Sequence, residues 1–173
     1  MIHILYRTAL RILVGGFQYG RGRLWAFTRP DVEGAHAIAL TPGGRIILVK
    51  LSYARGWHLP GGGRKAGESA EENVVRELRE EIGATSHDAP ALAFEVDEQV
   101  HHRRDHASVF IVRNVLYRPN RWSIEIERAI EADPADLPAD ISRRARRWID
   151  SANLYERREW QVGPLRNGSG GGT

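Results

Sequence analysis

Residues 57–84 read WHLPGGGRKAGESAEENVVRELREEIGA, and this stretch decides the fold. Four of the seven residues in 61–67 are glycine, which makes a loop that can turn sharply and bring bare backbone close to a ligand. Ser69 and Glu72 have the spacing of a capping box, so we expect a helix to begin immediately after Ser69. Gly83 supplies its end. The stretch therefore predicts a loop, a helix and a second loop.

The predicted helix carries an unusual cluster of like charges. At about 100° per residue, Glu77, Glu80 and Glu81 share one face. This face lies beside an apolar stripe that we expect to be buried. The stripe consists of Val74, Val75, Leu78 and Ile82. Like charges three or four residues apart destabilise a helix by roughly 0.2–0.5 kcal/mol per pair. A bound cation would explain the cluster, and glutamate oxygens suit Mg²⁺; the alternative is an ordinary solvated glutamate-rich helix.

Residues 62–84 resemble the signature box of the Nudix hydrolase family. That box reads Gly, five residues, Glu, seven residues, Arg-Glu, an aliphatic residue, any residue, Glu-Glu, any residue, Gly and an aliphatic residue. The matching positions are Gly62, Glu68, Arg76, Glu77, Leu78, Glu80, Glu81, Gly83 and Ala84. Ala84 is a small substitute for the usual aliphatic residue. The expected order of strands extends the resemblance over residues 33–160, which we expect to form the Nudix domain.

The resemblance implies both a fold and a reaction. The implied fold is α/β, an α/β/α sandwich around a mixed central sheet with the box as loop–helix–loop. The implied reaction is the hydrolysis of a diphosphate linkage in a nucleoside diphosphate derivative by a water that Mg²⁺ or Mn²⁺ activates. Nucleoside triphosphates, ADP-ribose, nucleotide sugars and dinucleotides all stay open as substrates. The alternatives are a non-catalytic module that binds or senses nucleotides, and RNA-end processing by the same chemistry.

The resemblance also implies roles for individual residues. Glu77, Glu80 and Glu81 would bind the metal or position the attacking water, and the carbonyl oxygen of Gly61 would join them. Arg76 would pair with Glu68 and orient the carboxylates, so that Glu77, Glu80 and Arg76 are the catalytic candidates. The positions expected to shape the box are Gly62, Glu68 and Gly83.

Two further sets of candidates complete the expected site. The family often uses a further acidic ligand, for which Glu125 is the best match and Glu127 the second; an exposed acidic residue on a strand is the alternative. The residues expected to bind substrate phosphates are Arg55, Arg64, Arg103, Arg104 and His106. The last three fall in a predicted loop, 101–106, which can overhang the site.

Strand patterns surround the box. Residues 35–40 and 45–51 predict a β-hairpin around a Thr-Pro-Gly-Gly turn. Residues 91–100 and 108–116 predict a second pair of strands, and 122–126 a further strand. An apolar periodicity of three and four residues predicts an amphipathic helix over 138–159.

The two ends of the chain read differently from the domain. Residues 1–32 predict an amphipathic helix and a linker. This helix would pack on the domain or on a second copy in a homodimer, or make weak contact with a membrane surface. Residues 161–173 are rich in glycine and serine and predict a flexible tail.

Composition limits the remaining possibilities. The chain has 173 residues, which suits one domain at about 150 residues each. Without cysteine it has no disulfide, thiolate metal site or thiol nucleophile. No run approaches the roughly 18 apolar residues of a membrane span. A net charge of +3 is too small to indicate a nucleic-acid partner. We expect a cytoplasmic protein, and the resemblance implies that its substrate is a small nucleotide-type diphosphate.

Overall fold

The computed structural model describes residues 31–100, 103–118 and 125–152. In chain order the elements are β1 (Asp31–Ala39), β2 (Ile46–Leu51), β3 (Trp57–His58), β4 (Gly61–Gly63), α2 (Ala70–Glu77), the π-helical turn η1 (Leu78–Ile82), β5 (Ala84–Ser86), β6 (Ala91–Val100), β7 (Arg103–Val112), β8 (Leu116–Tyr117), β9 (Ile126–Ala132) and α3 (Arg143–Ser151). No helix in these described ranges is long and apolar enough to cross a membrane. The predicted N-terminal helix and the tail lie outside the described residues.

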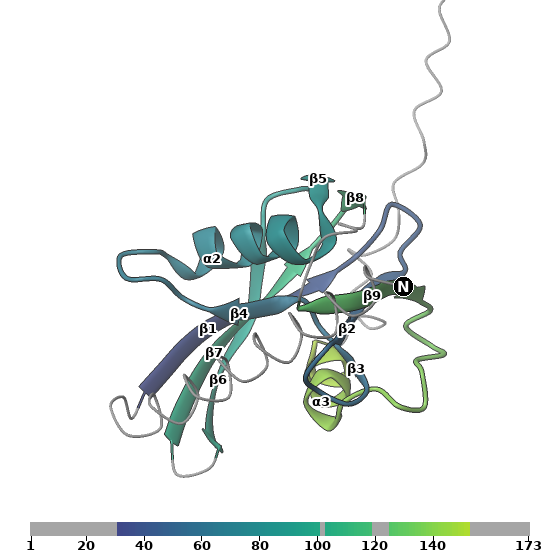
Figure 1. Cartoon of the computed structure of the whole chain (residues 1–173). Coiled ribbons are helices and arrows are strands. Elements are labelled where there is room, and N and C mark those ends of the chain that lie inside the picture. The colour runs from purple at the N-terminus through teal and green to yellow at the C-terminus, as the bar shows by residue number, and fades with distance from the viewer. Residues whose placement is uncertain (1–30, 101–102, 119–124, 153–173) are drawn as a thin grey trace, which may run out of the picture.

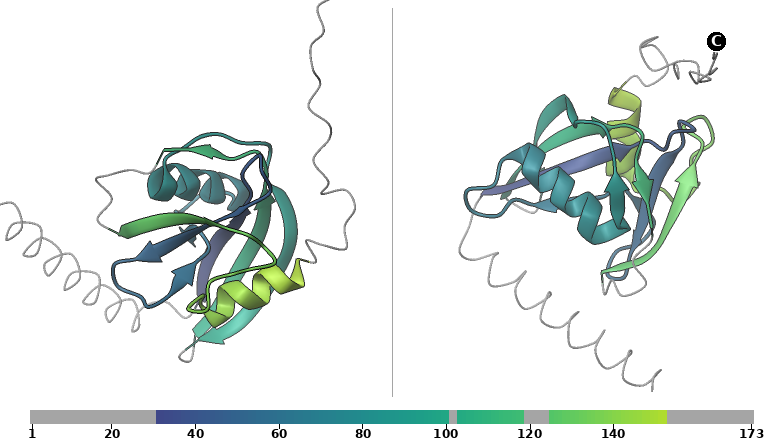
Figure 2. Two further views of the ribbon diagram at one scale, coloured as in Figure 1. Left: turned by 90° about the vertical axis from the view of Figure 1, so that its right-hand side faces the viewer. Right: turned by 90° about the horizontal axis from the view of Figure 1, so that it is seen from above.

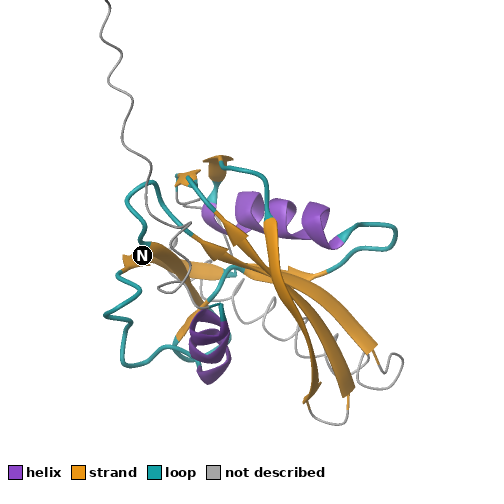
Figure 3. Ribbon diagram, turned by 180° about the vertical axis from the view of Figure 1, so that it is seen from behind, coloured by secondary structure: helices purple, strands orange, loops and turns teal. Residues whose placement is uncertain are grey.

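The strands form a mixed main sheet and two smaller sheets. The main sheet has the order β4-β1-β7-β6, a three-stranded sheet has the order β3-β2-β9, and β5 pairs with β8. Strands β1 and β7 are parallel, whereas β1–β4 and β6–β7 are antiparallel. The helix α2 covers one side of the main sheet and α3 lies on the other (Figures 1 and 3). This arrangement confirms the predicted α/β sandwich around a mixed sheet.

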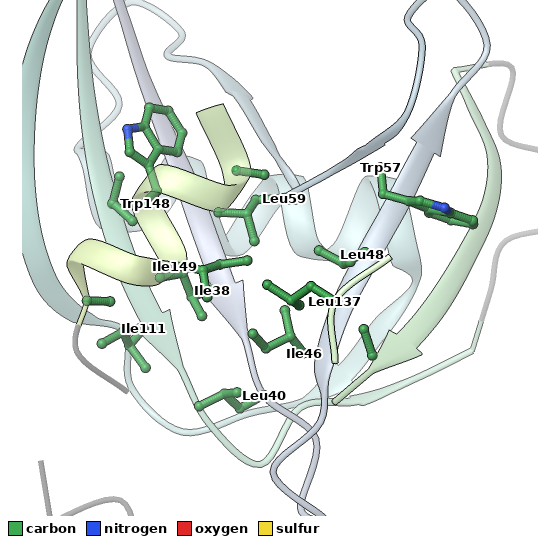
Figure 4. Packing of buried hydrophobic residues seen from close by; sticks show 14 of the residues in the cluster. Ile38, Leu40, Ile46, Leu48, Trp57, Leu59, Ile111, Leu137, Trp148 and Ile149 are labelled. Carbon is green, nitrogen blue, oxygen red and sulfur yellow. The ribbon is translucent and has the colours of Figure 1, made fainter. Parts of the chain in front are cut away.

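Strand β1 separates two hydrophobic clusters because successive side chains point to opposite faces of a sheet. Its odd-numbered residues Ala35, Ala37 and Ala39 belong to the α2 cluster, together with Val74, Leu78 and Ile82. Its even-numbered Ile38 belongs to the α3 cluster, as does Leu40, the next residue of the chain. Figure 4 shows this second cluster, with Trp148 at one end and Trp57 at the other. Both faces of the strand are therefore buried.

The predicted hairpin is wrong beyond its turn. The turn is present, because the Gly44 N–H donates to the carbonyl of Thr41 at 2.9 Å. Next to the turn, Leu40 and Ile46 form one isolated antiparallel bridge. Beyond that bridge β1 and β2 do not pair with each other and belong to different sheets, as Figure 2 shows. Both strands are buried on both faces, so their side chains did not reveal which neighbours they would pair with.

The predicted loop over residues 101–106 is also too long. Strand β6 ends at Val100 as predicted, but β7 begins at Arg103, not at residue 108. Parallel pairing with β1 runs from Asp31–Arg104 to Ala39–Val112. Backbone hydrogen bonds form between strands whether or not the side chains are polar. The polar sequence therefore led us to place residues 103–107 outside the strand, although they belong to β7.

The C-terminal helix is amphipathic as predicted, but it begins later. Its buried face carries Ala145, Trp148 and Ile149. Residues 138–142 are not helical, because the carbonyl of Asp140 accepts from the Trp57 N–H at 3.1 Å. Ser142 then caps the helix. The described helix ends at Ser151, and of the strand predicted at 122–126 only its last two residues are described, with β9 starting at 126.

Candidate active site

The capping signals set both ends of the box helix as expected. The Ser69 hydroxyl accepts from the Glu72 N–H at 3.1 Å, and the Glu72 carboxylate accepts from the Ser69 N–H at 2.8 Å. Gly83 ends the helix in the left-handed region with φ of 69°. A Cβ there would lie 2.1 Å from the carbonyl oxygen of Arg118, so only glycine fits.

The three candidate metal ligands on the box helix, Glu77, Glu80 and Glu81, differ in their exposure to solvent. The helix widens into the π-helical turn over Leu78–Ile82, a deformation frequent at functional sites. Glu81 is buried and the Glu77 side chain is 12% exposed, whereas the Glu80 side chain is 55% exposed. The carboxylates therefore run from the protein interior to solvent.

Arg76 joins the carboxylates into one network. Its Nε and Nη2 donate to the two oxygens of Glu68 at 2.8 and 3.1 Å. Its Nη1 donates to Glu77 at 2.8 Å and to Glu80 at 3.0 Å. This side-chain hydrogen bonding lowers the pKa of Glu68 to about 2, helped by the Lys65 N–H. Bidentate charged pairs of this kind have a defined geometry, so Arg76 orients three glutamates at once.

The protein only partly compensates the ionised forms of the two inner glutamates, Glu77 and Glu81. Burial raises the pKa of Glu81 to about 8, and the charges of Glu77 and Glu125 add to the shift. The Gly61 N–H opposes it by donating to Glu81 Oε2 at 2.9 Å. Burial also raises the pKa of Glu77, against the effect of Arg76. A divalent cation between these groups would relieve both burial and repulsion.

The glycines of β4 allow the loop to lie against the box helix. A Cβ on Gly62 would be 2.7 Å from Glu77 Oε1. A Cβ on Gly61 would be 2.4 Å from the carbonyl oxygen of Ala35 on β1. Strand β4 is thus inserted between β1 and the carboxylates, and its backbone forms one wall of the site.

Of the acidic candidates outside the box, Glu125 acts on it electrostatically. Burial is the main cause of the raised pKa values of Glu77 and Glu81, and the charge of Glu125 adds to both shifts. The carbonyl of Glu125 accepts from the Ser52 N–H at 2.8 Å, which fixes its backbone. Glu125 precedes β9, and its charge acts on the box glutamates; its place as a metal ligand stays a prediction.

Where their side chains are described, the residues expected to bind substrate do not converge on the carboxylates of the box. Arg64 forms an ion pair with Glu33 at 2.8 Å, and the His106 ring bonds to Asp97 at 2.8 Å. Arg55 is exposed in the turn before β3. Arg103 and Arg104 lie in β7, and their side chains are outside the described part. The structure places His106 on a strand beside acidic groups, where its pKa is raised, chiefly by Asp97.

Sequence reasoning missed two residues at this site. Tyr53, in the turn after β2, is 61% exposed, yet its pKa rises to about 12 through burial and then the charges of Glu125 and Glu81. Its side chain is therefore accessible and within electrostatic reach of the carboxylates. Asn73 is fully buried in α2. Signals were available: Tyr53 is an aromatic residue in a turn just before the box, and Asn73 precedes Glu77 by four residues, on its helical face.

The donor set suits a hard divalent cation. Within the described ranges no three His, Cys, Asp or Glu side chains converge closely enough to ligate one ion as they stand. The box nevertheless presents carboxylate oxygens, which are the ligands that Mg²⁺ and Mn²⁺ accept. Two of them carry raised pKa values through burial and mutual repulsion. The chemistry of these residues therefore fits such an ion. In the structure, the Arg76 guanidinium donates hydrogen bonds to Glu77 and Glu80.

Comparison with known proteins supplies the family. The model of the NUDIX domain matches residues 31–162. This chain belongs to the Nudix family. A segment of 51 residues is 49% identical to a putative 8-oxo-dGTP diphosphatase of Bacillus subtilis, over 30% of this chain and 34% of that protein. The match thus spans about a third of that relative.

Solved structures agree with the fold of this Nudix domain. A MutT NUDIX hydrolase from Burkholderia pseudomallei superposes with a TM-score of 0.62 and 26% identity, over 71% of this chain and 98% of that one. An ADP-ribose pyrophosphatase from Streptococcus suis superposes with a TM-score of 0.60 and 21% identity, over 76% and 95% of the two chains. The second likeness concerns the fold alone.

Proposed function

We propose that this Nudix domain is a pyrophosphohydrolase that cleaves the diphosphate linkage of a nucleoside diphosphate derivative with Mg²⁺ or Mn²⁺. The observation that carries the proposal is the cluster of partly buried glutamates on the box helix, held by Arg76. A stability role does not explain buried like charges, because desolvation and repulsion both disfavour them. A cation-dependent reaction does.

The proposed ligands of the metal are Glu77, Glu80, Glu81, Glu125 and the carbonyl oxygen of Gly61. When bound, the metal supplies charge neutralisation at the phosphate and lowers the pKa of a water. The protein's own contribution is orientation: Arg76 fixes Glu77 and Glu80 through one guanidinium. A carboxylate so placed can take the proton of the attacking water, a step typically worth about 10²–10⁴-fold in rate.

The substrate class follows from the family and from one side chain. The relatives named above include a putative 8-oxo-dGTP diphosphatase and an ADP-ribose pyrophosphatase, so their substrates share a nucleoside diphosphate and differ beyond it. Tyr53 is exposed, and the charges of the carboxylates act on its hydroxyl. An aromatic face there suits stacking on a nucleobase. We therefore assign Tyr53 to substrate binding.

A substrate panel tests the proposal. The purified chain would be incubated with Mg²⁺ or Mn²⁺ and a nucleoside triphosphate, ADP-ribose, a nucleotide sugar or a dinucleoside polyphosphate, and the products would be identified. We expect hydrolysis that Glu80→Gln and Glu81→Gln abolish. Glu71→Gln is the matched control, because Glu71 is exposed on the same helix. Unchanged activity in both site variants would contradict the assignment.

The same panel separates the alternative function. A nucleotide that raises the melting temperature of the protein without any product would favour a binding or sensing module. Tyr53→Ala and Tyr53→Phe refine the substrate assignment. We expect the alanine variant to raise KM for nucleotide substrates, and the phenylalanine variant to retain the parent KM because it keeps the ring.

A further inference from the structure

The box helix buries one polar side chain that the proposed mechanism does not use. Within the described part of the chain, Asn73 is the polar residue with no exposed surface. Its Nδ2 donates to the carbonyl oxygen of Gly63 at 3.1 Å. Its Oδ1 is also buried, and no donor among the described residues reaches it. Since a carbonyl oxygen can only accept, Nδ2 must face Gly63 and Oδ1 is the atom left without a donor.

Stability does not account for an asparagine at this position. Alanine has the highest helix propensity, and asparagine is among the weaker helix formers. A buried acceptor without a donor lowers stability further, because it loses its hydrogen bonds to water on folding. Asn73 stands next to the apolar residue Val74, which is fully buried. A stability-driven sequence would place alanine here.

Asn73 and Arg76 share one hydrogen-bond acceptor, the carbonyl oxygen of Gly63. The carbonyl oxygen of Gly63 also accepts from Arg76 Nη2 at 3.1 Å. Asn73 and Arg76 are three residues apart, so they lie on one face of the helix. The two side chains therefore hold a single carbonyl between them. Any movement of Gly63 would change the position of the Arg76 guanidinium, and Arg76 binds Glu68, Glu77 and Glu80.

The same carbonyl belongs to the strand that lines the site. Strand β4 has three residues, Gly61–Gly63. Its first residue donates its N–H to Glu81 at 2.9 Å, and the Cα of Gly62 faces the Glu77 carboxylate. Gly63, at the other end, is the residue that α2 anchors. Anchoring Gly63 therefore sets how closely the strand approaches Glu77 and Glu81.

We propose that Asn73 is a positioning residue for the carboxylate site. Its amide anchors Gly63 to α2 and thereby keeps β4 and Arg76 in the geometry that holds Glu77 and Glu81. It acts through these groups and touches no reacting atom. The catalytic part of this inference rests on the proposed hydrolase function, whereas the anchoring part does not.

Three variants of Asn73 test the catalytic part. Asn73→Ala and Asn73→Leu both remove the donor, and the leucine keeps the branching at Cγ with a larger side chain. Asn73→Asp replaces the donor with a group that, when ionised, repels the carbonyl. We expect kcat to fall about tenfold or more in all three, with little change in KM. We expect Asn73→Ala to melt close to the temperature of the parent, because removal of the unsatisfied acceptor offsets the lost hydrogen bond to Gly63 and the space left by the side chain.

The matched control is Val75→Ala on the same helix. Val75 is partly buried against the α2 cluster, so we expect this variant to melt earlier while keeping the parent kcat. A lower kcat without a lower melting temperature in Asn73→Ala is the result that a merely structural role would not give. A kcat within about twofold of the parent in that variant would overturn the proposal.

Amide hydrogen exchange tests the anchoring part without turnover. The Gly61 N–H is bonded to Glu81, so its exchange reports the approach of β4. We expect faster exchange at Gly61 in Asn73→Ala and unchanged exchange in Val75→Ala; equal rates in Asn73→Ala and the parent would overturn the anchoring role. A parent that hydrolyses nothing would refute the proposed function, and the exchange result would still decide this inference.

Discussion

The two helices on opposite sides of the main sheet handle charge in different ways. On α3, the charged side chains of Arg143 and Arg146 are exposed, and the buried face is apolar. On α2 and its continuation, Glu77 and Glu81 are withdrawn from solvent and Asn73 is fully buried. Both helices have apolar periodicity and a serine N-cap. On the α2 side the withdrawn groups are carboxylates gathered in one network, whereas on the α3 side they are separate groups such as His36.

The strand between the helices shows the same contrast. Toward α2 it presents three alanines, and toward α3 the larger Ile38. Small side chains let α2 lie close to the sheet, next to the glycines of β4. The α3 side is filled by large residues such as Trp148 (Figure 4). The comparison teaches that the helix built for packing keeps most of its charges at the surface, whereas the helix of the candidate site holds three glutamates and an arginine in one network.

The largest expected difference separates Arg76→Ala from Arg146→Ala. Removing Arg76 leaves the largely buried carboxylates of Glu68 and Glu77 without their partner, which we expect to destabilise the fold by about 3–5 kcal/mol. Hydrolysis should also fall about 100-fold or more. Arg146 is exposed on α3, so its variant should change stability by less than about 0.5 kcal/mol. Urea unfolding and kcat measurements check both, and similar effects of the two variants would remove the contrast.

The next largest effect is a pH dependence on the α3 side. Burial lowers the pKa of His36 to about 4, helped by the charge of Arg144. Its ring centroid lies 4.9 Å from that of Trp148. Because the folded pKa is lower than the unfolded value of about 6.5, the unfolded state binds the proton first as pH falls. Stability is therefore lost between about pH 6.5 and pH 4, by about 3 kcal/mol in total.

The measurement compares the parent with His36→Gln. Glu77 and Glu81 have raised pKa values, so they change stability in the opposite direction over overlapping pH values. The difference between the two proteins removes their contribution. We expect the stability of the parent relative to His36→Gln to decline from pH 7 to pH 4 in urea unfolding. A constant difference would show that His36 titrates normally.

A smaller effect is expected from Gly62→Ala. The new Cβ would be 2.7 Å from Glu77 Oε1. The end of a flexible side chain can move more easily than backbone, so the carboxylate should shift and the fold should persist. We expect kcat to fall about tenfold, equivalent to about 1.4 kcal/mol, with a melting temperature close to that of the parent. Gly43→Ala, where the nearest atom is 3.8 Å away, should leave kcat unchanged.

The smallest expected effect comes from the two N-caps. Ser69→Ala and Ser142→Ala each remove one cap hydrogen bond, and each should cost about 1 kcal/mol of stability. Activity should separate them, because only Ser69 caps the helix that carries the carboxylates. Thermal unfolding and kcat are the readouts. Equal activity loss in both variants would argue that the α2 side has no special link to function.

Local sequence signals predicted the box helix well because short-range physics governs it. The capping serine, the buried stripe and the terminal glycine each act within a few residues, and all three are found as predicted. The π-helical turn was not predicted, since a wheel at about 100° per residue assumes a regular α-helix throughout. The pairing of Arg76 with Glu68 came from the family resemblance, and the contact is present.

The errors all concern partners that are distant in the chain. The hairpin was assigned to β1 and β2 because they are adjacent in sequence, but β1 pairs with β7 and β4, and β2 with β9 and β3. Arg103–His106 looked like a loop because they are polar, but two neighbouring strands engage their backbone. The start of α3 was set too early because Asp140 bonds to Trp57.

The sequence by itself determined the box, its helix and the residues that make the carboxylate cluster, since these depend on spacing within about twenty residues. The tertiary structure alone decided how that cluster works as a site. It brought the charge of Glu125, just before β9, and the hydroxyl of Tyr53, in the turn after β2, within electrostatic reach of the box glutamates, and it buried Glu81 and Asn73. Burial and long-range proximity arise only when distant segments pack together, and they turn a pattern of like charges into a site with shifted pKa values.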